Sequence, residues 1–149
     1  MQTELGSPDF WDRLRNDSSE LSKELCSIDV VDLDTTLQQH PALRAWLGAA
    51  YESLRVREER MAFELRKARA RAILNAHQAV DAVTNKPKTM AILEAEAELD
   101  ETVEQFTKVL LDLQELRRSL HVICGSMEDR LQMLIQLAVK HRQEQKAYS

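Results

Sequence analysis

The strongest pattern in the chain is a heptad repeat in its C-terminal third. From Leu99 onward, apolar residues recur at alternating intervals of four and three residues, which is the spacing of a coiled-coil seam. We therefore expect one helix from about Thr89 to His141. The seam consists of Leu99, Val103, Phe106, Leu110, Leu113, Arg117, Leu120, Cys124, Met127, Leu131, Leu134 and Ala138.

A second apolar row follows the same helix, at Val109, Leu116, Ile123 and Leu137. A stripe this wide exceeds what one partner helix covers, so it predicts a further helix or a second subunit. We expect a homo-oligomer packed through this helix. Arg117 either sets the register of that oligomer or extends its charged end out of the seam. The expected interface consists of Phe106, Leu110, Leu113, Arg117, Leu120, Met127, Leu131 and Leu134.

An earlier helix is predicted from Pro41, or already from Asp34, to about Ala82, because apolar residues recur there at helical intervals. About 40 residues at 1.5 Å each give a rod of roughly 60 Å. The segment 84–89 contains an Asn and a Pro, which stop one helix and start the next. So short a link predicts an antiparallel helical hairpin.

Residues 1–34 form an acidic leader, with nine acidic and three basic residues and a local charge of −6. Ser7 followed by Pro8 is typical of a helix start. We expect a short helix that breaks around residues 16–19 and an extended connector over residues 27–34. The chain then divides into the leader, 1–34, and a hairpin domain, 35–149, that is expected to carry the oligomer interface.

Composition narrows the fold to the all-α class. Three Gly and three Pro in 149 residues cannot supply the turns of an all-β fold or a Gly-rich nucleotide loop. The expected architecture is a long antiparallel helical hairpin with a short N-terminal helical segment, assembling as a homo-oligomeric helical bundle or ring. No apolar run is long enough to cross a membrane, and no signal peptide is recognisable. Cys26 and Cys124 are expected to be reduced thiols in a cytoplasmic protein.

Neither an enzyme nor a metal site is expected. The chain has no clear nucleophile, base and acid set, and its four histidines never pair at helical spacing. The acidic run from Glu94 to Glu104 could bind a divalent cation or form a solvated helix face, and the lack of a nearby His favours the solvated face. No cofactor is implied.

A basic segment stands out in a chain whose net charge is −5. Between Arg55 and Arg71, seven cations and three glutamates leave a charge of +4. Such a band attracts phosphates without reading bases, and an oligomer would repeat it along a flexible strand. The alternatives are a solvated face, pairing with the acidic run, or a membrane surface, which ranks third. The candidate nucleic-acid-binding residues are Arg60, Arg66, Lys67, Arg69, Arg71, Lys86 and Lys88.

From Leu21 to His141 the layout resembles the UvsY-type recombination mediators of tailed phages. The segments that carry the resemblance are Ile28-Asp29, Asp34-Thr35-Thr36-Leu37, Pro41-Ala42-Leu43, Trp46-Leu47, Lys67-Ala68-Arg69 and Glu94-Ala95-Glu96-Ala97-Glu98-Leu99-Asp100. Only Lys67 and Arg69 match the DNA-contacting element of the family. Ala70, Ala72 and Ile73 follow that element, where family members often have aromatic residues.

The resemblance implies small helical proteins that form rings and bind single-stranded DNA. It also implies partners, namely a single-strand-binding protein to be displaced and a RecA-like recombinase to be loaded. We therefore expect a non-enzymatic, single-stranded-DNA-binding recombination mediator. The alternative is a coiled-coil structural or scaffold protein without nucleic-acid binding.

Overall fold

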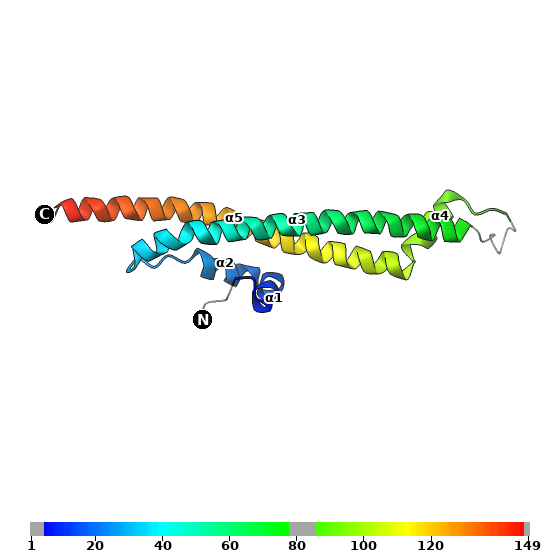
Figure 1. Cartoon of the computed structure of the whole chain (residues 1–149), viewed down its shortest axis with the longest axis horizontal. Helices are drawn as coiled ribbons and strands as arrows, with labels where there is room; N and C mark the ends of the chain where they lie inside the picture. The colour runs from blue at the N-terminus through cyan, green and yellow to red at the C-terminus, as the bar shows by residue number, and fades with distance from the viewer. Residues whose placement is uncertain (1–4, 78–85, 148–149) are drawn as a thin grey trace. The chain divides into compact units, whose positions relative to one another are not determined.

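The computed structural model describes residues 5–77 and 86–147, and in that part of the chain it contains helices and no strands (Figure 1). The predicted all-α class is therefore confirmed. The helices are α1 (Pro8–Asn16), α2 (Ser18–Cys26), α3 (Leu33–His77), α4 (Met90–Glu98) and α5 (Glu101–Ala147).

The chain forms two compact units, and α3 and α5 contribute segments to both. Unit 1 combines Met1–Ser53 with Glu115–Ser149, and unit 2 is Leu54–Gln114. Unit 1 thus contains α1, α2, the start of α3 and most of α5. Unit 2 contains the rest of α3, α4 and the start of α5.

The two leader helices follow the local sequence signals. The Ser7 hydroxyl accepts a hydrogen bond from the Phe10 N–H at 3.2 Å, and Pro8 is the first helical residue. Asp17 leaves helical geometry and separates α1 from α2. The predicted helix start and the break around residues 16–19 are both confirmed.

The start of α3 differs from the prediction that favoured Pro41. The helix begins at Leu33 and Pro41 lies inside it. The reason is local capping, because the Asp32 carboxylate accepts the N–H of Thr35 at 3.2 Å. The predicted end near Ala82 lies outside the described residues, as do Thr84 and Asn85 of the predicted link.

The predicted helix from about Thr89 to His141 starts as expected, with Thr89 directly before α4, but it is interrupted once and ends later than predicted. Two helices, α4 and α5, replace it, and α5 continues to Ala147. The break falls at Asp100, whose carboxylate accepts the N–H groups of Thr102 and Val103 at 2.9 and 3.2 Å and so caps α5. Leu99, the first seam residue, is 84% exposed beside this break.

In unit 1 the leader helices pack onto α3 and α5. Phe10 lies edge-on to Trp46 of α3, with ring centroids 4.9 Å apart, and the Cys26 thiol lies 3.7 Å from the Met127 sulfur of α5. The contacts of Arg44 with Glu128 and of Tyr51 with Arg117 show that the two long segments run antiparallel in this unit. The fully buried leader side chains are Phe10, Leu14 and Leu21.

The buried row of α5 in unit 1 is shifted sideways from the predicted seam. It combines alternate seam positions with the second row, because α3 lies on one side of α5 and the leader on the other. The remaining seam positions Arg117, Cys124 and Leu131 are only half-buried. The buried row is Leu116, Leu120, Ile123, Met127, Arg130 and Leu134.

Unit 2 has a smaller core of mostly small side chains. The buried residues come from α3, α4 and α5, and three partly buried side chains pack against them. The buried set is Leu65, Ala68, Ala72, Ala97 and Val103, and the partly buried set is Ile73, Phe106 and Leu110.

Candidate nucleic-acid interface

All seven predicted nucleic-acid-binding cations belong to unit 2, and three of them are paired with carboxylates. Lys67 lies 3.1 Å from Glu64 one turn earlier on α3, and Arg69 lies 2.7 Å from Glu98 of α4. Lys88 lies 2.7 Å from Glu96, and its side chain is 14% exposed. Pairing with the acidic run, one of the alternatives that the sequence left open, therefore accounts for Arg69 and Lys88.

The other four cations are exposed. Within residues 5–77 and 86–147, no carboxylate forms an ion pair with Arg60, Arg66 or Arg71. Arg60, Lys67 and Arg71 recur at intervals of seven and four residues, which places them on one side of α3. Lys86 lies in the connection before α4 and is exposed as well.

Sequence reasoning missed the role of Phe63 in this surface. Phe63 is 53% exposed, with the Lys67 ammonium 5.2 Å and the Arg66 guanidinium carbon 6.0 Å from the centroid of its ring. The signal was present, because an aromatic residue three and four positions before two cations places all three on neighbouring parts of a helix. The basic surface of α3 thus includes one exposed aromatic side chain among its described residues.

Three of the six acidic residues between Glu94 and Glu104 form ion pairs with other described residues. The carboxylates of Glu96 and Glu98 pair with Lys88 and Arg69, and the carboxylate of Glu104 pairs with Lys108. The hydrogen bond from Lys108 lowers the pKa of the Glu104 carboxyl. Within residues 5–77 and 86–147, no three His, Cys, Asp or Glu side chains come together in a geometry that could hold a metal ion.

The residues predicted for the oligomer interface occupy two kinds of position. Leu113 is buried in unit 2, and Leu120, Met127 and Leu134 are buried in unit 1 by contacts within one chain. The half-buried members are Phe106, Leu110, Arg117 and Leu131. The interface itself stays a prediction.

Arg117 has a partner within its own chain. It donates a hydrogen bond to the Tyr51 hydroxyl at 3.1 Å, and its guanidinium lies 5.9 Å from the Tyr51 ring centroid. A residue held in this way can stabilise the antiparallel pairing of α3 and α5 in unit 1 without any second copy.

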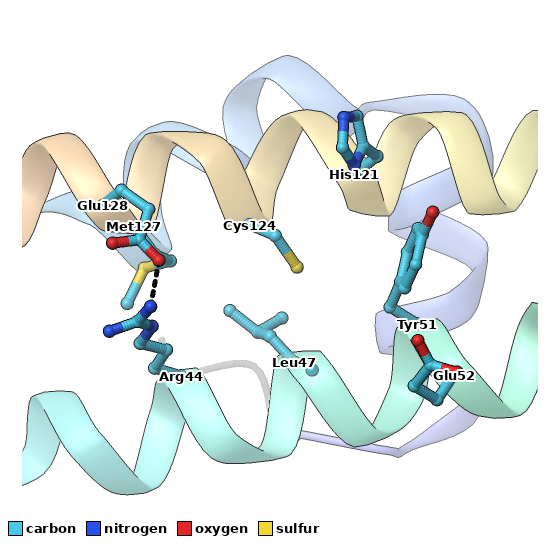
Figure 2. A pocket seen from close by; sticks show the side chains of 9 residues that line it. Arg44, Leu47, Tyr51, Glu52, His121, Cys124, Met127 and Glu128 are labelled. Carbon is cyan, nitrogen blue, oxygen red and sulfur yellow. Dashed lines mark hydrogen bonds and ion pairs between the residues drawn. The ribbon is translucent and has the colours of Figure 1, made fainter.

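Unit 1 contains a groove of about 410 Å³ between α3 and α5 (Figure 2). The ion pair of Arg44 and Glu128 lies at one end, and Tyr51 lies at the other end with His121. Cys124 lines the groove, and burial, followed by the nearby Glu128, raises the pKa of its thiol. A thiol that stays protonated is a poor nucleophile, so the groove offers no evident chemistry.

A buried polar cluster in unit 1 was also missed. Arg130 donates to the Ser27 carbonyl from Nε at 3.2 Å and from Nη2 at 3.1 Å, and its Nη1 lies 2.8 Å from Nδ1 of His40. Because a guanidinium only donates, His40 accepts through Nδ1 and carries its proton on Nε2. Arg130 stands in the second apolar row, halfway between Ile123 and Leu137, and this interruption was the available signal.

No protein-family model, curated protein or solved structure matches the chain. Across the described residues, no helix combines the length and the apolar character needed to cross a bilayer.

Proposed function

We propose that the chain is a non-enzymatic, single-stranded-DNA-binding recombination mediator that assists the loading of a RecA-like recombinase onto single-stranded DNA. The observation that carries the proposal is the exposed set Arg60, Arg66 and Arg71 beside the exposed ring of Phe63. Cations without nearby carboxylate partners are available to phosphates, and an aromatic face is available to bases.

Three arginines bind a strand only weakly, so the proposal includes assembly of several copies. We infer that the long helices form a hairpin and that several hairpins associate as a bundle or ring, which repeats the arginines along one strand. Exposed apolar side chains of α5 support contact between copies. These are Val109, Leu111, Val122, Met133, Ile135 and Val139.

Weak, base-independent contacts suit a mediator. A protein that passes a strand to a recombinase has to hold it and then release it, and contacts with phosphates are individually weak and sensitive to salt. The resemblance to UvsY-type mediators supports the same role. The separation along the chain of the basic band from the leader, whose local charge is −6, also supports it. A single-strand-binding protein and the recombinase would be the further partners.

A coiled-coil scaffold without nucleic-acid binding is the second candidate. It is favoured by the ion pairs that engage Lys67, Arg69 and Lys88 within the chain. If these pairs only stabilise unit 2, the remaining arginines are a solvated face.

Binding of an oligo-dT strand at several salt concentrations separates the two candidates. Fluorescence anisotropy should give a steep fall in affinity with salt, and the triple variant Arg60→Ala/Arg66→Ala/Arg71→Ala should flatten that slope by up to about 2, at roughly 0.7 per phosphate contact. A control that removes the same charge elsewhere, Lys108→Ala/Lys140→Ala/Arg142→Ala, should leave the slope unchanged. An intact protein that fails to bind at low salt would favour the scaffold.

Two further measurements test the rest of the proposal. Light scattering should show an oligomer, and a stable monomer at micromolar concentration would remove the multivalent strand contact. Recombinase activity on DNA coated with a single-strand-binding protein should increase when the chain is added. No increase, despite strand binding, would leave a DNA-binding protein that is not a mediator.

A further inference from the structure

We propose that Phe63 stacks on an unpaired base while Arg66 and Lys67 bind the adjacent phosphates, so that this point of α3 selects single strands over duplex. The inference rests on the proposed nucleic-acid binding and adds to it a residue and a source of strand selectivity. It assigns a ligand chemistry, a base with its two flanking phosphates, to a side chain that the core does not use.

Phe63 is directed away from the core of unit 2. The α3 residues in that core are Leu65, Ala68 and Ala72, which lie on the other side of the helix from Phe63 by their spacing. Phe63 is 53% exposed to water as a residue. An aromatic ring left in water gains free energy when a flat apolar surface covers it.

The two cations at the ring are placed to exchange partners. The Lys67 ammonium lies 5.2 Å and the Arg66 guanidinium carbon 6.0 Å from the ring centroid, and Lys67 also pairs with Glu64 at an exposed site. Exposed cation–π contacts and exposed ion pairs are both weak. A nucleotide within a strand offers its base to the ring and its two flanking phosphates to the two cations. The ring and the cations therefore each gain a stronger partner.

A duplex cannot make the same contact. Its bases are already stacked on each other, and only their edges are accessible in the grooves. Stacking on an aromatic side chain requires a base that has been splayed out, which is the normal state of a single strand. The cations remain available to duplex phosphates, so duplex binding should be weaker and independent of the ring.

An anionic lipid surface is the competing occupant of this side of α3. A helix that lies on a membrane needs a continuous apolar face. Here the exposed apolar residues Val56, Phe63 and Leu74 are seven and eleven residues apart, with Arg60 and Lys67 between them. The interruption by charge favours a strand that alternates bases with phosphates.

The test compares wild-type protein with Phe63→Ala, Phe63→Trp and Phe63→Leu, using three ligands of equal length. These are an oligo-dT strand, an abasic strand with the same phosphates, and a duplex. We expect Phe63→Ala and Phe63→Leu to weaken oligo-dT binding about tenfold, while abasic-strand and duplex binding and the salt slope stay unchanged. Phe63→Trp should retain oligo-dT binding, because it preserves the stacking surface. Circular dichroism checks that each variant keeps its helices.

Four results would overturn the inference. Oligo-dT binding by Phe63→Ala that equals wild type removes the stacking contact but leaves the proposed function standing. An equal loss on the abasic strand shows that the ring acts only by positioning the cations. Phosphatidylserine vesicles serve as a fourth ligand, and a loss of binding by Phe63→Ala that is confined to them assigns the ring to a lipid surface. Wild-type protein that binds none of the three nucleic acids rejects the proposed function together with the inference.

Discussion

Arg130 should be the polar side chain whose loss most destabilises unit 1. It is 7% exposed and places three donors on the Ser27 carbonyl and on Nδ1 of His40, which is itself 2% exposed. The guanidinium thus ties the segment after α2 to α3 and α5. Arg130→Met keeps most of the aliphatic stem and removes the donors.

The magnitude follows from the acceptors left behind. Nδ1 of His40 loses its partner in a buried position, which costs about 2 kcal/mol, and the part-buried Ser27 carbonyl can recover a water at a cost of about 1 kcal/mol. Burial lowers the pKa of Arg130, so its charged form pays a desolvation penalty that the Met variant avoids, and this offsets part of the loss. We expect a net loss of about 2 kcal/mol, a large part of a typical folding stability of roughly 5–15 kcal/mol.

Urea unfolding followed by two probes measures this loss. Circular dichroism reports the helices, and tryptophan fluorescence reports the leader, because Trp11 and Trp46 pack around Phe10 in unit 1. The matched control is Arg142→Ala, an exposed arginine of the same helix, which should change stability by less than about 0.5 kcal/mol. In the double variant Arg130→Met/His40→Leu, the cost should be smaller than the sum of the two single costs, because the buried Nδ1 acceptor of His40 is removed together with its donor.

Three outcomes would contradict the expected role of Arg130 in unit 1. If Arg130→Met unfolds at the same urea concentration as wild type, the hydrogen bonds of the guanidinium contribute nothing net. If the double variant costs the full sum of the single variants, Arg130 and His40 are not coupled. If the wild-type leader unfolds at a much lower urea concentration than α3 and α5, the contact of Arg130 with the Ser27 carbonyl does not stabilise its packing.

Three other changes have expected outcomes. Burial, followed by Arg130 and Arg44, lowers the pKa of His40 below 6.5, so the stability it contributes is complete above about pH 6.5 and is lost as the pH falls toward the lowered pKa; urea midpoints measured from pH 7 to 5 should fall, and His40→Gln should flatten that part of the curve. Gly125→Ala should raise thermal stability by about 0.5–1 kcal/mol, because a Cβ there meets no atom within 4 Å and Ala favours the helix; a lower melting temperature would contradict this. Asp100→Ala should cost about 1 kcal/mol in urea unfolding by removing the cap of α5, whereas Asp100→Asn should cost less.

The sequence predicted features that depend on a few neighbouring residues. The helix start at Ser7 and Pro8 and the break around residues 16–19 were confirmed because side chains and backbone within one turn determine them. The prediction failed where two local signals compete. Pro41 is compatible with a first helical turn, but the cap at Asp32 starts the helix at Leu33, next to the alternative start at Asp34. Pro41 therefore lies in the third turn of α3.

The sequence predicted which residues make up the candidate site, but not which of their side chains are free of ion pairs. Charge spacing identified the cations of α3, yet it could not say that Arg69 pairs with Glu98 while Arg66 does not, because that choice depends on where α4 lies. The heptad likewise identified the apolar side of α5 without showing which of its rows the leader covers. Phe63 was visible in the sequence, but only its exposure in the folded unit distinguishes it from a core aromatic residue.

The burial of the α5 row changes what a contact between copies requires. The second apolar row predicted a further helix or subunit, and in unit 1 the leader of the same chain supplies that helix, with Cys26 on Met127 and the Ser27 carbonyl on Arg130. A second copy that packs on Ile123 and Met127 has to displace this leader first, because both side chains are already fully or almost fully buried. Docking of the leader and assembly through that row are therefore mutually exclusive. An oligomer with docked leaders has to use other surfaces, such as the exposed Val109 and Leu111 of unit 2.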